Sequence, residues 1–179
     1  MDTGVIVRPV EARDVAFILN LERSCFADGW GRVFLPEMLA RRSTVGNVVA
    51  VEGTVCGYSI YRRVKVRRNG FEFRKLFLDF MAVVPECRRS GLGTLLALEM
   101  LENLDVGRPM AETYVRERDL ASQLFLRSCG WIATGLESEC GEEPWYRMVF
   151  RNAWTDNWLE TYRQRRLTPD NVDAVLGTG

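Results

Sequence analysis

The 179-residue sequence contains no histidine, which removes the side chain that most often serves as a catalytic base or a zinc ligand near neutral pH. Its five cysteines are odd in number and scattered, and they form no Cys-x-x-Cys pair. We therefore expect no metal site and neither a Ser-His-Asp nor a Cys-His hydrolase. This cysteine usage also favours reduced thiols in a cytoplasmic protein.

An excess of one charge and a long apolar run are missing as well. Lys+Arg and Asp+Glu both total 24, so the formal net charge is zero. A nucleic-acid-binding domain usually carries a basic excess, so we expect no nucleic acid partner. No stretch of about 18 apolar residues could span a bilayer, and the first residues lack the basic and apolar segments of a signal peptide. We expect no membrane partner.

Apolar residues make up 47% of the chain, and their spacing switches between strand and helix periods. The pattern predicts an α/β (α+β) fold in residues 1–152, followed by an appended helix and a loose tail in residues 153–179. The helix, Trp154 to Arg166, carries an aromatic stripe that packs on the domain or on a second copy in a homodimer. Strands are predicted at 5–10, 47–52, 55–66, 71–84, 111–115, 131–133 and 146–150, with tight turns at Glu52-Gly53 and Asn69-Gly70. Helices are predicted at 15–26, capped by Asp14, at 35–42, with Pro36 in its first turn, and at 92–104 and 120–128.

The segment between residues 81 and 94 is the most informative part of the sequence. A buried strand ends at Pro85, and Arg88-x-x-Gly91-x-Gly93 then leads into a leucine-rich helix. Glycines let the backbone approach a ligand closely, and the free amides at a helix start attract an anion. The spacing fits neither a P-loop nor a dinucleotide fingerprint. It predicts a site that can hold a pyrophosphate without a large net positive charge.

Residues 81–93, Met-Ala-Val-Val-Pro-Glu-Cys-Arg-Arg-Ser-Gly-Leu-Gly, closely resemble the acyl-CoA-binding signature of the GCN5-related N-acetyltransferase (GNAT) superfamily. The branch most similar to this sequence contains the ribosomal-protein N-terminal acetyltransferases. Residues 115–131 resemble that branch too, with Asp119 at its helix-capping Asn and Gly130-Trp131 at its Gly-Phe. The resemblance implies a GNAT fold with a mixed sheet of six to seven strands, splayed between strands 4 and 5, and about four helices.

The resemblance also implies a binding mode for acetyl-CoA. The pantetheine arm enters where strand 71–84 parts from strand 111–115. The backbone of Met81, Ala82 and Val83 holds the thioester and pantetheine, with an amide as oxyanion donor. Asp119 contacts the cosubstrate arm if it behaves like the family Asn. The amides predicted to surround the pyrophosphate are those of Arg88, Arg89, Ser90, Gly91, Leu92, Gly93 and Thr94.

The catalytic positions depart from the family pattern. Where the branch has a Glu base and a Tyr acid, this sequence has Tyr114 and Leu126. Asp79, an isolated acid in an apolar strand, is one replacement base, or else a carboxylate paired with Arg74 or Arg62. Glu112 is the second candidate base, and Tyr114 is a candidate donor to the departing thiolate or a packed aromatic.

These patterns predict an acetyl-CoA-dependent N-acetyltransferase that acts on a primary amine by direct attack. A protein N-terminus or a lysine is the favoured acceptor. Two alternatives stay open at this point: a small-molecule amine as acceptor, and a catalytically weak acyl-CoA-binding or interaction module of the same fold.

Overall fold

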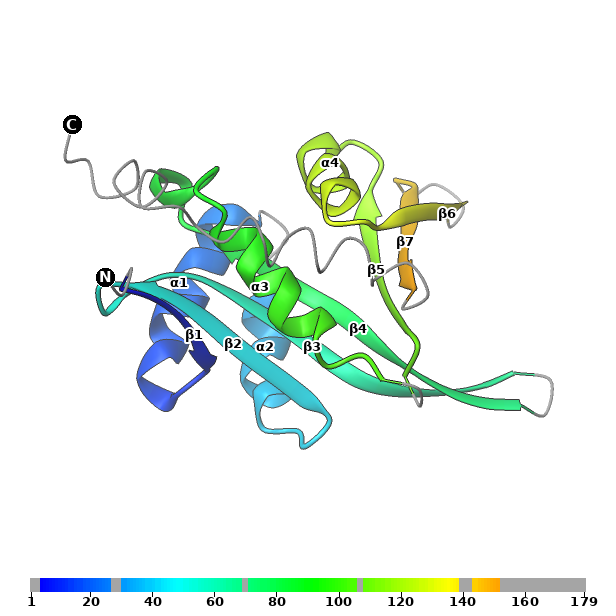
Figure 1. Cartoon of the computed structure of the whole chain (residues 1–179), viewed down its shortest axis with the longest axis horizontal. Coiled ribbons are helices and arrows are strands. Elements are labelled where there is room, and N and C mark those ends of the chain that lie inside the picture. Colours follow the sequence, from blue (N-terminus) through cyan, green and yellow to red (C-terminus); the bar gives the residue numbers. More distant parts are fainter. Residues whose placement is uncertain (1–3, 27–29, 69–70, 106–107, 139–142, 152–179) are drawn as a thin grey trace. The chain divides into compact units, whose positions relative to one another are not determined.

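The computed structural model describes residues 4–26, 30–68, 71–105, 108–138 and 143–151. These residues form a seven-stranded mixed sheet in the order β1-β2-β3-β4-β5-β7-β6, together with four α-helices (Figure 1). The predicted α+β fold is confirmed. The elements are β1 Val5–Pro9, η1 Ala12–Asp14, α1 Val15–Cys25, α2 Trp30–Leu39, β2 Thr44–Val51, β3 Thr54–Arg68, β4 Phe71–Val83, η2 Pro85–Cys87, α3 Leu92–Leu101, β5 Met110–Arg116, α4 Leu120–Ser128, β6 Ile132–Glu137 and β7 Trp145–Arg151.

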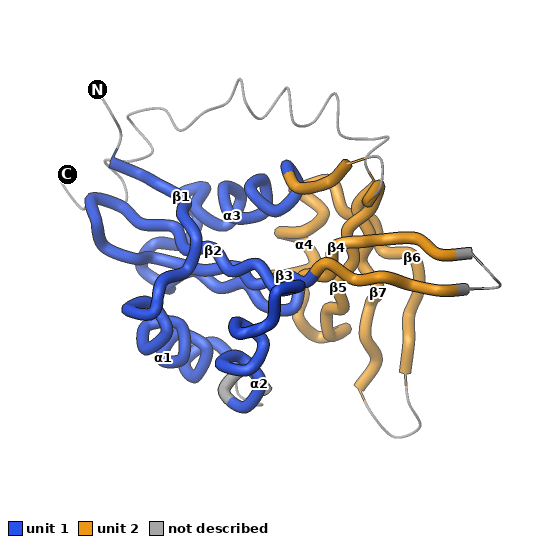
Figure 2. Tube along the Cα trace, turned by 90° about the horizontal axis from the view of Figure 1, so that it is seen from below, with its two compact units in different colours: residues 1–62, 79–102, 165–179 blue, residues 63–78, 103–164 orange. Residues whose placement is uncertain are grey.

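The chain divides into two compact units (Figure 2). Unit 1 comprises residues 1–62, 79–102 and 165–179, and unit 2 comprises residues 63–78 and 103–164. The boundary falls inside β3 and inside β4, so each of these long strands contributes one part to each unit. Every contact described below lies within a single unit.

Unit 1 has an apolar cluster on each face of its strands. Successive strand residues point to opposite faces, and β2 shows this at Val48 and Val49. Val48 packs in the cluster that holds Ile18 of α1 and Leu35 of α2. Val49 packs in the cluster that holds Leu92 and Leu96 of α3. The alternation of apolar residues in β2 therefore places α1 and α2 on one face and α3 on the other.

Unit 2 is built on β5, which pairs antiparallel with β7, and β7 in turn pairs antiparallel with β6. Helix α4 ends at Ser128, and Gly130, two residues later, has a left-handed φ of 84°. Trp131 follows directly and is almost fully buried, with its ring centroid 6.1 Å from that of Phe150 on β7. This aromatic pair anchors the end of α4 to the strands of unit 2.

Two local predictions are corrected. Helix α2 spans Trp30–Leu39 rather than 35–42, so Pro36 lies inside it and not in its first turn. Asp14 precedes α1 as expected, but its carboxylate accepts from Arg8 and from the Glu11 amide instead of capping the helix. The 3₁₀ turn η1, formed just before α1, has turned this side chain toward β1.

The predicted turn at Glu52-Gly53 is confirmed, because both residues have positive φ, 48° and 82°. The predicted Asn69-Gly70 turn and the predicted helix at residues 154–166 lie outside the described residues.

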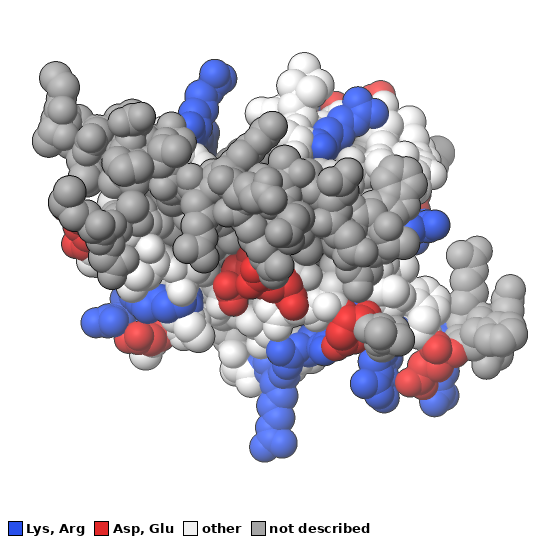
Figure 3. Space-filling model, viewed as in Figure 1, with Lys and Arg blue, Asp and Glu red and all other residues white. Residues whose placement is uncertain are grey.

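No helix in the described part of the chain is long and apolar enough to cross a membrane. On the face shown in Figure 3, the basic and acidic side chains that are drawn in colour lie interspersed.

Candidate active site

The connection between β4 and α3 contains two left-handed residues in unit 1. After η2, Arg89 has a φ of 65° and Gly91 a φ of 85°. Gly91 is the N-cap of α3, and no side chain among the described residues caps that first turn. The first amides of α3 are therefore available to an anion, which the helix dipole also favours. Residues 88–94, which the sequence assigned to a pyrophosphate, occupy this connection.

Side chains of the connection hold it to its surroundings. The Arg88 guanidinium donates through Nε to the Val83 carbonyl at 3.0 Å and through Nη2 to Cys25 Sγ at 3.3 Å. The Ser90 hydroxyl donates to the Cys87 carbonyl at 2.5 Å. The Arg88 side chain is thus engaged within the protein, and the group left for a ligand is its backbone amide, as predicted from the sequence.

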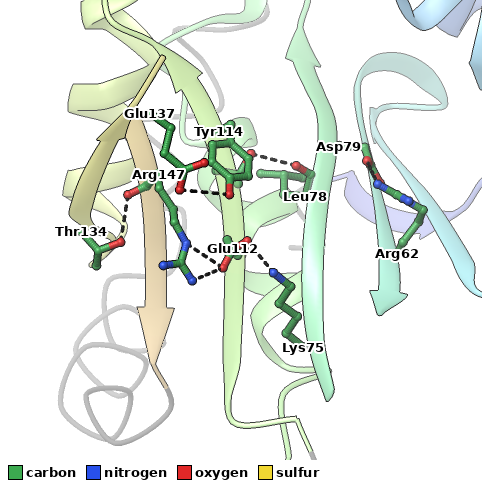
Figure 4. A network of polar contacts seen from close by, with 10 residues as sticks. Arg62, Lys75, Leu78, Asp79, Glu112, Tyr114, Thr134, Glu137 and Arg147 are labelled. Atoms are coloured by element: carbon green, nitrogen blue, oxygen red, sulfur yellow. Dashed lines mark hydrogen bonds and ion pairs between the residues drawn. The ribbon is translucent and has the colours of Figure 1, made fainter. Parts of the chain in front are cut away.

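Asp79 on β4 is paired with Arg62 on β3, one of the two partners that the sequence offered. Arg62 donates to both carboxylate oxygens, from Nε at 2.7 Å and from Nη2 at 2.6 Å (Figure 4). The Asp79 side chain is only 9% exposed. Burial raises the pKa of the Asp79 carboxyl above its ordinary value, although the hydrogen bonds from Arg62 act to lower it.

Glu112 on β5 is held from two other strands. Lys75 of β4 donates to its Oε1, while Nε and Nη2 of Arg147 on β7 donate to its Oε2 at 3.0 and 2.6 Å (Figure 4). Burial acts to raise the pKa of Glu112, but the bonds from Lys75 and Arg147 together hold that pKa below its ordinary value. Both oxygens of this carboxylate already accept hydrogen bonds, and the group has a low affinity for a further proton.

Tyr114 lies on β5, on the same face as Glu112. Its ring centroid is 5.9 Å from that of Phe77, and its hydroxyl lies 3.5 Å from Glu137 Oε1. Burial, followed by the charges of Glu112 and Glu137, raises the pKa of the Tyr114 hydroxyl. The hydroxyl therefore keeps its proton, as a donor must. Leu126, at the family's acid position, is almost fully buried on α4 and carries no proton to donate.

Asp119 caps α4, as the sequence predicted. Its Oδ1 accepts from the Ser122 amide at 3.0 Å. This bond gives the residue a structural role whether or not it contacts a cosubstrate. Within the described residues no group of three or more Cys, Asp or Glu side chains is arranged to hold a metal ion.

The predicted site residues thus fall into two groups. Asp79 and residues 81–94 belong to unit 1, whereas Glu112, Tyr114 and Asp119 belong to unit 2. Lys75 and Arg147, the partners of Glu112, were not among the predicted site residues. A signal for them existed, because an acid in an apolar strand needs buried cations, and both residues lie in predicted strands.

Comparison with known proteins bears on these features. Residues 15–131 match the sequence profile of the acetyltransferase (GNAT) family. Aminoglycoside N(6')-acetyltransferase type 1 from Klebsiella aerogenes is 30% identical over 103 residues, which cover 54% of this chain and 68% of that protein. The chain therefore belongs to the GNAT family, and it is an acyltransferase. The predicted resemblance is confirmed.

Solved structures share the fold at low sequence identity. Arabidopsis thaliana NAA60 in complex with acetyl-CoA superposes with a TM-score of 0.71 at 12% identity, covering 82% of this chain and 99% of that one. The ribosomal-protein-S18-alanine N-acetyltransferase from Escherichia coli superposes with a TM-score of 0.67 at 18% identity, covering 82% and 93%. At these identities the likeness shows the GNAT fold.

Proposed function

We propose that this GNAT protein transfers the acetyl group of acetyl-CoA to a primary amine. The observation that carries the proposal is the β4–α3 connection, in which left-handed residues lead into a helix start with uncapped amides. Such a start binds a pyrophosphate through backbone groups, consistent with a chain of zero net charge. Acetyl-CoA bound to a protein of the same fold supports this choice of donor.

In the proposed reaction, the amine nitrogen attacks the thioester carbonyl carbon and the carbon–sulfur bond breaks. The amine proton passes to Asp79, and the departing thiolate takes a proton, for which Tyr114 is the candidate donor. The amide of Met81 polarises the carbonyl. The contrast between the two acids favours Asp79 as base, since burial raises its pKa, whereas the two cations lower that of Glu112.

A protein N-terminus or a lysine is the acceptor we favour, because the motif resembles the ribosomal-protein branch. The curated relative acts on an aminoglycoside, which supports a small amine as the alternative. Release of CoA in the presence of peptides with free N-termini or of aminoglycosides separates these two acceptor classes.

Calorimetric titration with acetyl-CoA tests the donor site. The Gly91→Glu variant places a negative charge at the helix start and should abolish binding, while Gly91→Gln imposes the same left-handed strain without the charge. Gly135→Glu adds the same side chain on β6, where a Cβ meets nothing within 4 Å, and should bind normally. The donor site is disproved if the unchanged protein fails to bind or if Gly91→Glu binds as tightly as Gly91→Gln.

A further inference from the structure

Two cysteine side chains meet in unit 1, on the face of the strands that α3 covers. Cys56 of β3 is buried, and Cys87 of η2 is partly exposed. Cys87 packs against the apolar cluster that contains Cys56, and the two thiols interact through a side-chain hydrogen bond. Cys87 also directly precedes residues 88–94, the segment predicted to hold the pyrophosphate. The pair of thiols therefore adjoins the donor site.

A β-bulge turns Cys56 toward Cys87. The register between β2 and β3 shifts between Val49 and Ala50, which leaves Cys56 as an extra residue of β3. Tyr58, two positions further along β3, packs with α1 and α2, whereas Cys56 packs with α3. Regular alternation would place both side chains on one face of the strands. The bulge thus brings the Cys56 thiol to the face on which Cys87 packs.

The backbone also links the two cysteines. The Val84 amide donates to the Cys56 carbonyl at 2.8 Å, and the Val84 carbonyl accepts from the Cys87 amide at 2.9 Å. Cys56 lies in β3, which has β2 on one side and β4 on the other, whereas Cys87 ends a three-residue 3₁₀ turn. A change in the distance between the two sulfurs therefore moves the turn rather than the strand.

Their surroundings give the two thiols different reactivity. Burial, together with the interaction with Cys87, raises the pKa of the Cys56 thiol to about 11. This thiol keeps its proton near neutral pH and is shielded from a dissolved oxidant, whereas Cys87 is accessible to one. An accessible cysteine next to a second cysteine is the arrangement in which the first is oxidised and the second resolves the product as a disulfide.

We propose that Cys56 and Cys87 form a reversible disulfide that weakens acetyl-CoA binding when hydrogen peroxide is present. The peroxide O–O bond breaks as the Cys87 sulfur takes one oxygen to become a sulfenic acid, and the other oxygen leaves as water. The Cys56 sulfur then attacks the sulfenic sulfur, and the hydroxyl leaves with the Cys56 thiol proton as a second water. The two thiols together lose two electrons and two protons, which the peroxide takes up.

The disulfide acts on the donor site through η2. A covalent bond holds two sulfurs closer together than a hydrogen bond does, so Cys87 moves toward β3. Its carbonyl accepts from the Ser90 hydroxyl at 2.5 Å, and the next residue is Arg88, whose amide is assigned to the pyrophosphate. The movement therefore displaces amides that the pyrophosphate requires. This effect on acetyl-CoA rests on the proposed function, whereas formation of the disulfide does not.

The test treats the full chain with hydrogen peroxide, blocks the remaining thiols and locates disulfides by mass spectrometry. The unchanged protein should form the Cys56–Cys87 disulfide. Calorimetry should then give a Kd for acetyl-CoA at least about tenfold higher, the effect of losing one hydrogen bond to a charged group. Dithiothreitol should restore both thiols and the original Kd.

Two variants separate this disulfide from other oxidation. Cys87→Ser lacks the thiol that reacts first, so its Kd for acetyl-CoA should be the same before and after peroxide. Cys25→Ser is the matched control, because Cys25 also borders the donor site, with its Sγ 3.3 Å from Arg88 Nη2. Cys25→Ser should lose affinity on peroxide treatment as the unchanged protein does.

Absence of the Cys56–Cys87 disulfide after peroxide treatment overturns the proposal, as does a disulfide-bonded protein that binds acetyl-CoA as tightly as the reduced one. An equal loss of affinity in peroxide-treated Cys87→Ser overturns it too. If Cys87→Ser fails to fold, Cys87→Ala replaces it, since it also lacks the thiol. Failure of the proposed function is distinguishable, because the reduced protein would then bind no acetyl-CoA, whereas the mass spectra still report on the disulfide.

Discussion

Arg62 on β3 forms a bidentate ion pair with Asp79 on β4, donating one hydrogen bond to each carboxylate oxygen at 2.7 and 2.6 Å. The arginine fixes the orientation of the carboxylate, and burial raises the carboxyl pKa more than the arginine lowers it. A carboxylate with a raised pKa takes up a proton more readily than an ordinary aspartate does. This suits a group that must accept a proton from an attacking amine.

Replacing Asp79 with Asn should lower kcat about 100-fold, the size of effect expected for loss of a general base. The Kd for acetyl-CoA should stay unchanged, because Asn keeps the size of the side chain and an oxygen for Arg62. Steady-state release of CoA and calorimetry measure the two quantities. Asp14→Asn is the matched control, since Arg8 forms a second bidentate ion pair with the buried Asp14 carboxylate, with N–O distances of 2.6 and 2.9 Å. An equal loss of kcat in both variants would exclude a special role for Asp79.

The pKa of Asp79 can be followed directly by carboxyl carbon NMR. In the unchanged protein its midpoint should lie above the ordinary aspartate value of about 3.9. Arg62→Gln should raise it further, because the arginine is the group that lowers this pKa. A midpoint that falls or stays constant in Arg62→Gln would mean that Arg62 does not set the proton affinity of Asp79.

Much of the fold was predictable because local signals agreed with one another. The leucine repeat of α3, the Asp119 cap and the Glu52-Gly53 turn each act over a few residues, and each forms as expected. Helix α2 was misplaced because proline favours a first helical turn, whereas here packing of Leu35 and Met38 in the core sustains a helix around an internal Pro36. Tertiary packing outweighed the local signal.

The site was harder to predict, because its charges are set by residues far apart in the sequence. From sequence alone, Asp79 and Glu112 are two similar acids in two apolar strands. Glu112 meets Lys75 and Arg147, each at least 35 positions away, and these two cations reverse the effect of burial on its pKa. Asp79 is bonded to a single arginine, which does not outweigh the effect of burial on the Asp79 pKa. Only the packing of the strands distinguishes the two.

Glu112→Gln should act on stability more than on turnover. Removing the acid leaves Lys75 and Arg147 close together without their shared partner, which should lower the free energy of unfolding by about 2 to 3 kcal/mol. The fall in kcat should be far smaller than for Asp79→Asn. Urea unfolding at neutral pH measures the first quantity, and steady-state kinetics the second. A kcat loss equal to that of Asp79→Asn would show that Glu112 takes part in proton transfer.

Glu72→Gln is the matched control for this variant, since Glu72 also faces two cations, Lys65 and Arg67, but on an exposed strand segment. Its effect should stay below about 0.5 kcal/mol. If it destabilises the protein as much as Glu112→Gln does, burial is not the source of the Glu112 effect.

The stabilising effect of Glu112 should also depend on pH. Its pKa is lower in the folded protein than in the unfolded chain, so the contribution is complete above about pH 5 and is lost as the pH falls through the folded value. The difference in unfolding free energy between the unchanged protein and Glu112→Gln should therefore be constant near neutrality and shrink as the pH falls below the ordinary glutamate value of about 4.3. A difference that grows in acid would contradict the assigned direction of the pKa shift.

Two substitutions at Asp119 can distinguish its role as the cap of α4 from a contact with the cosubstrate. Asp119→Ala removes the bond to the Ser122 amide and should lower the free energy of unfolding by about 1 kcal/mol. Asp119→Asn keeps a capping oxygen and should leave stability within a few tenths of a kcal/mol. If the side chain touches the acetyl-CoA arm, as the resemblance implies, the amide should bind the cosubstrate more tightly than the acid, because a carboxylate repels the anionic cosubstrate. Equal Kd values for acetyl-CoA in the Asn and Ala variants and the unchanged protein would restrict Asp119 to its role as the cap of α4.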